Sequence, residues 1–273
     1  MPGENNNERV RMFVLPTLLT AGNLFCGYKA VILIATGRFS SAFPDEAFQL
    51  YREGILWILG AFVFDFLDGM IARLVRRESA FGRELDSLAD LLSFGMAPAL
   101  LVASIVLSEF PRLGWIVAFV YLACGAMRLA RFNVLPSTAT KEFVGFPIPA
   151  AAGVTMSLTL LILWLNEHER ELGRWKWAIL LVMVLLSYMM ISNFRYPSFK
   201  NLDWAMEKPF HVLLPAVLIA VLIAKFYQIG LAVIFVSYLL YGLVRPWVRR
   251  NIRKEIELEE TDDESPADKP ASP

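Results

Sequence analysis

The chain has 273 residues, 56% of which are hydrophobic, and a mean hydropathy of +0.51. These values exclude an ordinary soluble globular domain and indicate a protein that crosses the membrane several times. Basic and acidic residues balance at 26 each, so no overall positive field points to a nucleic acid as a partner.

Apolar runs long enough to cross a bilayer recur along the chain. We place about eight of them, at residues 13–36, 53–73, 87–108, 113–132, 146–165, 176–193, 209–225 and 228–246. The first run follows Arg9 and Arg11, but it is too long for a signal peptide and lacks a convincing cleavage site. The expected fold is therefore all-α, a polytopic bundle of transmembrane helices that retains its first span.

Lysines and arginines are concentrated in the segments that a cytoplasmic N-terminus would place inside the cell. The positive-inside rule therefore predicts that both termini face the cytoplasm from the cell membrane. Residues 251–273 are rich in acids and proline, so we expect a disordered tail, or alternatively a tail that binds a partner. We divide the chain into an N-terminal segment (1–12), a core (13–200), additional transmembrane helices (201–250) and this tail.

Four carboxylates lie at the inner ends of the second and third predicted spans. The run reads Asp65-x2-Asp68-Gly69-x2-Ala72-Arg73-x8-Gly82-x3-Asp86-x3-Asp90. Helical spacing places each pair of acids on one face, and four such acids would repel one another in a low-dielectric setting. Two hard divalent cations, Mg²⁺ or Mn²⁺, would relieve this repulsion and typically clamp phosphoryl groups. The small residues beside the acids would let a ligand approach the backbone.

Other interpretations of the acidic run remain open at this point. The acids could pair with arginines of a cytoplasmic helix-loop-helix, namely Arg73, Arg76, Arg77 and Arg83, although ion pairing does not explain the spaced glycines. A secondary transporter also needs membrane acids, but no internal repeat is visible in this chain. An intramembrane aspartyl protease would need a Gly-x-Gly-Asp run, which is absent.

Two further features carry polar chemistry. Thr20 and Asn23 share one face of the first span, where they could form interhelical hydrogen bonds or face a ligand; Pro16 is expected to begin that helix. Arg128 and Arg131, three residues apart, could hold a carboxylate or phosphate, or else anchor the fourth span at lipid headgroups.

The remaining residues with reactive side chains are expected to be structural. Pro147 and Pro149 predict a sharp start for the fifth span, in an architectural role. His168 and His211 have no companion residues for metal or triad chemistry, and we expect both to be non-catalytic. Cysteines 26 and 124 lie in apolar segments, as packing residues would.

The acidic run resembles the signature of the CDP-alcohol phosphatidyltransferases at every fixed position and at both spacings. The resemblance implies that an alcohol attacks the phosphorus next to the lipid of a CDP-activated lipid, and that CMP leaves. It implies Asp90 as the general base, which could share a metal, and a homodimer. By the same resemblance, the metal ligands would be Asp65, Asp68, Asp86 and Asp90, and the CDP-lipid site would contain Asn23, Asp68, Gly69, Ala72, Arg73 and Gly82.

Between about residues 12 and 200, several runs also resemble the integral-membrane phosphatidylserine synthases, including CGAMRLARFN at 124–133 and FVGFPIPAAAG at 143–153. The resemblance implies CDP-diacylglycerol and L-serine as substrates, with Arg128 or Arg131 on the serine carboxylate. Thr17 departs from the asparagine expected in many relatives. Glycerol 3-phosphate or inositol phosphate could use the same arginines, so another acceptor alcohol stays open.

Overall fold

The computed structural model describes the backbone of residues 6–40, 44–75, 80–105, 111–134, 142–167, 175–192, 195–197 and 228–243. Side chains are described for residues 16–40, 45–71, 80–105, 112–134, 145–165, 177–192 and 228–243. The chain divides into two compact units, Met1–Phe235 and Val236–Pro273. The candidate site and the contacts analysed below belong to the first unit.

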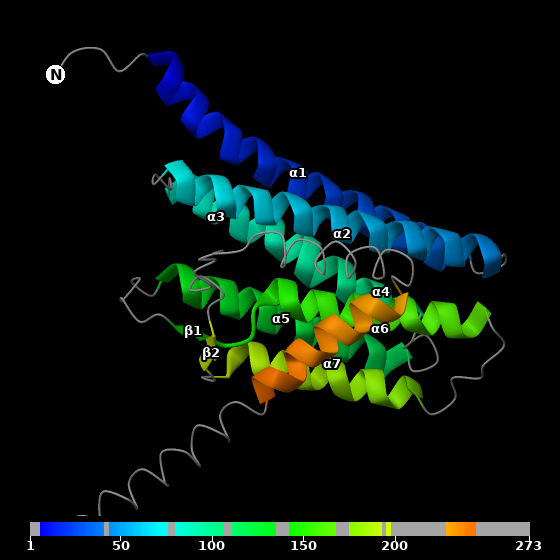
Figure 1. Cartoon of the computed structure of the whole chain (residues 1–273). Coiled ribbons are helices and arrows are strands. Elements are labelled where there is room, and N and C mark those ends of the chain that lie inside the picture. The colour runs from blue at the N-terminus through cyan, green and yellow to red at the C-terminus, as the bar shows by residue number, and fades with distance from the viewer. Residues whose placement is uncertain are drawn as a thin grey trace, which may run out of the picture. The chain divides into compact units, whose positions relative to one another are not determined.

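The described residues are helical almost throughout (Figure 1). The helices are α1 (Asn6–Phe39), α2 (Pro44–Val75), α3 (Ala80–Asp90), the π-helix η1 (Leu91–Met96), α4 (Ala97–Ile105), α5 (Pro111–Val134), α6 (Ile148–Glu167) and α7 (Trp175–Ile191). A further helix covers Gln228–Leu243. Two short strands, β1 (Glu142–Val144) and β2 (Arg195–Pro197), pair antiparallel.

Five of the described helical segments are long and apolar enough to cross a membrane. They are Pro16–Phe39, Asp45–Ile71, Ala80–Ile105, Arg112–Val134 and Ile148–Leu165, and two shorter apolar helices cover Trp177–Ile191 and Gln228–Leu243. The predicted all-α, polytopic membrane fold is therefore confirmed. The predicted span at 209–225 and the predicted tail at 251–273 lie outside the described residues.

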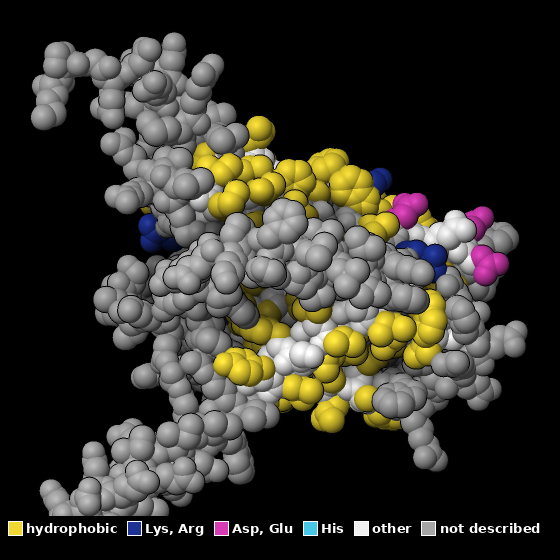
Figure 2. Space-filling view, viewed as in Figure 1, with side chains coloured by type: hydrophobic (Ala, Val, Ile, Leu, Met, Phe, Trp, Pro, Cys, Tyr) yellow, Lys and Arg dark blue, Asp and Glu magenta, His cyan; other side chains and the backbone are white. Residues whose placement is uncertain are grey.

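Large hydrophobic side chains are exposed along α1 and α2. Figure 2 shows apolar groups over this face, and the exposed residues include Phe25 and Ile32 of α1 and Leu56, Val63 and Phe66 of α2. A soluble protein would bury side chains of this size, whereas lipid tails solvate them. This surface fits a multi-pass membrane protein.

Helix α1 is the packing partner of both acid-bearing helices. It lies along α2 in Figure 1 and also contacts α3, η1 and α4. Ala30 and Ile34 of α1 and Ile58 and Ala61 of α2 are fully buried. Small residues at such positions let neighbouring helices approach closely in a membrane. The packing thus brings one face of α1 to the start of the acidic run and also to its end.

The expectation that Pro16 begins the first helix is wrong. Helix α1 starts at Asn6, and Pro16 lies inside it. A proline within a helix removes the backbone hydrogen bond to the carbonyl oxygen four residues earlier, a loss that membrane helices tolerate. Thr20 Oγ1 donates a hydrogen bond to the Pro16 carbonyl oxygen at 3.1 Å. The expected start of α6 is confirmed, because that helix begins at Ile148 between the two prolines.

Gly145 holds the turn between β1 and α6 against the end of α7. Its φ is +84°, and a Cβ placed there would lie 2.6 Å from the carbonyl oxygen of Met190. The next residue, Phe146, donates its backbone N–H to the Met189 carbonyl oxygen at 3.0 Å. A residue with a side chain would therefore be strained and would also push against backbone.

We expect Gly145→Ala to destabilise the protein by about 1–3 kcal/mol, because alanine disfavours a left-handed backbone and its Cβ has no room here. The measurement is the thermal melting temperature in detergent micelles. Gly60→Ala is the matched control, since its Cβ would meet only Cys26 Sγ, at an ordinary 3.5 Å. Equal melting temperatures for the two variants would contradict the assigned role of Gly145.

Candidate active site

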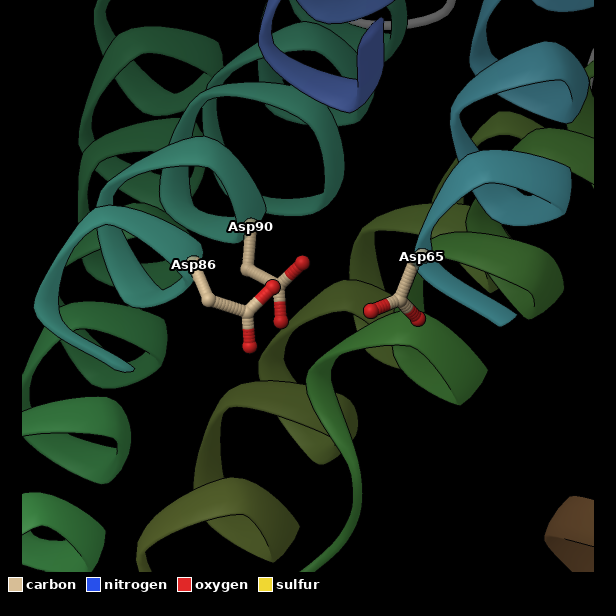
Figure 3. A group of neighbouring side chains, drawn as sticks. All are labelled: Asp65, Asp86 and Asp90. Atoms are coloured by element: carbon tan, nitrogen blue, oxygen red, sulfur yellow. The ribbon is translucent and has the colours of Figure 1, made fainter. Parts of the chain in front are cut away.

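Three carboxylates from two helices converge in the first unit. Asp65 of α2 and Asp86 and Asp90 of α3 each offer an oxygen atom, and these atoms all lie within 4.8 Å of one another. In Figure 3 the side chains of Asp86 and Asp90 project together from α3, and Asp65 faces them from α2. The sequence predicted that these acids meet, and the structure brings them together.

The local helix geometry explains how α3 presents two acids at once. Asp86 and Asp90 are four residues apart, so their side chains lie on one face, one turn above the other. Asp90 is the last residue of α3 and is buried, while Asp65 and Asp86 are partly exposed. Asp90 is therefore the most buried acid of the cluster.

A π-helix begins directly after Asp90, a feature that the sequence analysis missed. Within η1, the cap N–H of Ala97 bonds to the carbonyl oxygen of Leu92, five residues earlier. Pro98 has no N–H, so the carbonyl oxygen of Phe94 loses its ordinary α-helical donor. Tyr121 of α5 donates its hydroxyl to that oxygen at 3.2 Å. Pro98 was the signal that could have predicted this irregularity, which often marks functional sites.

Two side chains of α1 bond to acids of the run. Asn23 Nδ2 donates to Asp90 Oδ1 at 3.1 Å, and the Thr20 hydroxyl donates to Asp68. Thr20, Asn23 and Asp68 are all buried. The Oδ1 atom of Asn23 is buried too, and it has no hydrogen-bond partner among the described residues. The predicted shared face of Thr20 and Asn23 thus lies against the acidic run.

Asp68 does not join the group of three carboxylates. It follows Asp65 by three residues on α2, close enough for the two charges to interact, but its oxygen Oδ2 accepts the hydrogen bond of Thr20. Its predicted role as a metal ligand remains a prediction. Asp68 and Asp65 share a face of α2, yet their immediate partners differ.

The two arginines of α5 have different surroundings. Arg128 is half-buried, and its charge acts on Asp90. Arg131 is exposed, and its Nη1 donates to the carbonyl oxygen of Ile191, the last residue of α7, at 3.4 Å. A cation at a helix C-terminus is favourable for the helix dipole. The charge of Arg128 therefore acts on the carboxylate cluster, whereas Arg131 is bonded to the end of α7.

Asn133 near the end of α5 holds α3 in place, a contact that sequence reasoning missed. Its Nδ2 donates to Ser87 Oγ at 3.0 Å and to Glu84 Oε2 at 3.2 Å. Ser87 adjoins Asp86 in the chain, so this contact fixes α3 close to the acids. The CGAMRLARFN run contains Asn133, but nothing in the sequence indicated its partners.

The small residues of the run are only partly described. Gly69 lies on α2 and Gly82 on α3, and both are partly exposed. Ala72 and Arg73 lie within the last turns of α2, but their side chains are outside the described residues, as are those of Arg76 and Arg77. Both histidines, at 168 and 211, also fall outside them.

The carboxylate cluster fits a divalent cation. It offers oxygen atoms alone, which suit hard ions such as Mg²⁺ and Mn²⁺. Oxygens on opposite sides of one Mg²⁺ lie about 4.2 Å apart, close to the span of this cluster. Small side-chain movements would therefore bring the three oxygens around an ion, which would also offset their mutual repulsion.

Apolar helices that bring together acids able to hold a divalent cation fit a membrane enzyme that acts on phosphoryl groups. The sequence profile of the CDP-alcohol phosphatidyltransferase family matches residues 13–196, and the chain belongs to this family. Because the chain belongs to this family, the acidic run is interpreted as the family's signature and no longer as part of a transporter or as a set of ion pairs.

Curated relatives show which members of this family the chain resembles. The chain is 34% identical to the CDP-diacylglycerol--serine O-phosphatidyltransferase of Helicobacter pylori strain 26695 over 236 residues, 86% of this chain and 91% of that protein. It is 35% identical to the Bacillus subtilis protein of the same name over 190 residues, 70% of this chain and 93% of that protein. The archaetidylserine synthase of Methanothermobacter thermautotrophicus is 33% identical over 195 residues, covering 70% and 73%.

Proposed function

We propose that this protein transfers a phosphatidyl group from CDP-diacylglycerol to the hydroxyl group of L-serine, producing phosphatidylserine and CMP. The observation that carries the proposal is the carboxylate cluster of Asp65, Asp86 and Asp90, in a chain of this family. The similarity to relatives named for serine supports the choice of acceptor.

In the proposed reaction, the serine hydroxyl oxygen attacks the phosphorus that carries the lipid. The bond from that phosphorus to the oxygen of CMP breaks, and the serine proton passes to a carboxylate oxygen of Asp90. Asp90 suits the role of base because it is the most buried acid of the cluster. Its charge interacts with those of Asp65, Asp86 and Arg128.

We assign the metal site to the four acids of the run. Asp65 and Asp86 would hold divalent Mg²⁺ or Mn²⁺, and Asp90 would share one of the ions. Asp68, which is bonded to Thr20, would be the fourth ligand. When bound, two such ions neutralise the pyrophosphate and the charge that develops on the leaving CMP. Loss of the Thr20 hydrogen bond would free an oxygen of Asp68 for this purpose.

The CDP-lipid is proposed to bind along the small-residue faces beside these acids. Gly69 and Gly82, together with Asp68, Ala72 and Arg73, form the proposed nucleotide and pyrophosphate site. We further propose that the protein is a homodimer of the cell membrane, with its active site and both termini facing the cytoplasm. The bias of positive residues in the sequence supports this orientation.

The decisive experiment supplies purified protein with CDP-diacylglycerol, Mg²⁺ or Mn²⁺, and one alcohol at a time, and measures CMP release. We expect release with L-serine and little with glycerol 3-phosphate or inositol phosphate. Release with one of the phosphorylated alcohols and not with serine would overturn the proposed acceptor. A parallel assay with a CDP-activated archaeal ether lipid tests which lipid is preferred.

Arg128 is the proposed partner of the serine carboxylate, because its charge acts on Asp90. We expect Arg128→Lys to raise the KM for serine by about 10-fold or more, since lysine keeps the charge but loses the bidentate geometry. The KM for CDP-diacylglycerol should change less. Steady-state CMP release with serine varied at saturating CDP-lipid is the measurement.

Arg131→Lys is the matched comparison, because it makes the same change three residues away on α5. It should affect serine KM less than Arg128→Lys if the hydrogen bond to Ile191 is its main role. Serine methyl ester should be a poor acceptor for the wild type and should discriminate little between wild type and Arg128→Lys. An unchanged serine KM in both lysine variants would contradict arginine recognition of the acceptor.

A further inference from the structure

Asn23 is a neutral, fully buried side chain of α1 that contacts the proposed base. Its Nδ2 lies 3.1 Å from Asp90 Oδ1, and this is the hydrogen bond that the side chain makes among the described residues. An ionised carboxylate accepts hydrogen bonds and cannot donate them, so the NH₂ group of the amide has to face Asp90. The orientation of Asn23 thus follows from the chemistry of its partner.

The backbone of Asn23 is itself held by the segment that follows Asp90. Ser93 of η1 donates its hydroxyl to the carbonyl oxygen of Asn23 at 3.1 Å, and Ser93 is fully buried. Gly27, one turn after Asn23, lies so close that a Cβ there would be 2.9 Å from the Ser93 Cα and would overlap its hydroxyl. Backbone contact between α1 and η1 therefore fixes the distance from Asn23 to Asp90.

This arrangement restricts one degree of freedom that matters for a base. A carboxylate can rotate about its last side-chain bond, and a base needs one oxygen directed at the hydroxyl that it deprotonates. A hydrogen bond from a rigidly held amide to one oxygen limits that rotation and leaves the other oxygen available. Such supporting hydrogen bonds commonly decide how well a reactive group is oriented.

We propose that Asn23 is a positioning residue for Asp90, holding one carboxylate oxygen through its amide while Ser93 and Gly27 lock α1 against η1. This role differs from contact with the nucleotide, and it rests on the proposed function insofar as Asp90 is the base. Asn23 acts on the rate of the chemical step and not on substrate affinity.

The test measures kcat and both KM values for Asn23→Ala and for the nearly isosteric Asn23→Leu, in detergent micelles with saturating divalent ion. We expect kcat to fall about 10–100-fold, with the KM values for CDP-diacylglycerol and the acceptor within about threefold of wild type. Thr36→Ala is the control on the same helix, because Thr36 is exposed and its hydroxyl donates to the Ile32 carbonyl oxygen of its own helix. Its kcat should stay within twofold of wild type.

A second measurement separates positioning from a general structural effect. In the Asp90→Asn background, Asn23→Ala should lower the residual rate by less than twofold, because a residue that acts through Asp90 has nothing left to position. Melting temperatures identify the variants that fold. The test can be carried out with either Asn23→Ala or Asn23→Leu, provided that one of them folds.

Two results would overturn the proposal. One is a raised KM for CDP-diacylglycerol with kcat preserved, which would make Asn23 a nucleotide contact. The other is an undiminished effect of Asn23→Ala when Asp90 is already asparagine. Failure of the proposed serine activity is recognised separately, since wild type would then use another acceptor, with which the same variants are measured.

Discussion

Asp90→Asn is expected to lower kcat by about 10²–10⁴-fold, the usual contribution of a general base. Asparagine has nearly the same shape as aspartate, so α3, η1 and the contact with Asn23 should persist. It has no basic oxygen at neutral pH, and the serine proton then lacks an acceptor. CDP-lipid binding should change little in comparison, because Asp65 and Asp86 keep their carboxylates.

The measurement combines single-turnover CMP release with equilibrium binding of CMP or CDP-lipid in the presence of Mg²⁺ or Mn²⁺. Asp45→Asn is the matched control, since Asp45 is an exposed acid in the first turn of α2, far along the helix from Asp65. The control should retain wild-type turnover. Near-normal turnover in Asp90→Asn would rule out Asp90 as the base.

Asp65→Asn and Asp86→Asn are each expected to weaken divalent metal binding by at least the 10–100-fold that is typical of losing a supporting group around a metal, or about 1.4–2.8 kcal/mol. Each acid supplies an oxygen to the cluster, whose ligand atoms lie within 4.8 Å of one another. An amide oxygen is a weaker ligand for a hard cation because it carries no full charge. Nucleotide affinity should fall in parallel, since the pyrophosphate is proposed to be held through the ions.

Mn²⁺ titration of each variant, followed by CMP binding at fixed Mn²⁺, checks this expectation, and Asp45→Asn again serves as control. Asp68→Asn adds a further comparison. A loss of metal affinity would support Asp68 as a ligand, whereas unchanged affinity would restrict Asp68 to its contact with Thr20. Activity that survives exhaustive chelation would refute the metal mechanism altogether.

Much of the fold could be predicted from local properties of the sequence. Segment length and hydropathy identified the helices from α1 to α7, with errors at their ends, because the thickness of the bilayer sets the length of a span. Pro16 misled the prediction of the start of α1, since a membrane helix tolerates a proline in its interior. The π-helix was also missed, because its stability depends partly on a hydroxyl group from α5.

The sequence by itself determined which residues are candidates for the chemistry. Spacings of three and four residues on a helix settle which side chains share a face, so the two acid pairs and the pairing of Thr20 with Asn23 could be recognised without coordinates. Only the tertiary structure decided which of these groups meet. It joined Asp65 to Asp86 and Asp90, turned Asp68 toward Thr20, and set Asn23 against Asp90. Contacts between separate helices depend on their rotation and closeness of approach, which the packing of all the surrounding side chains fixes together.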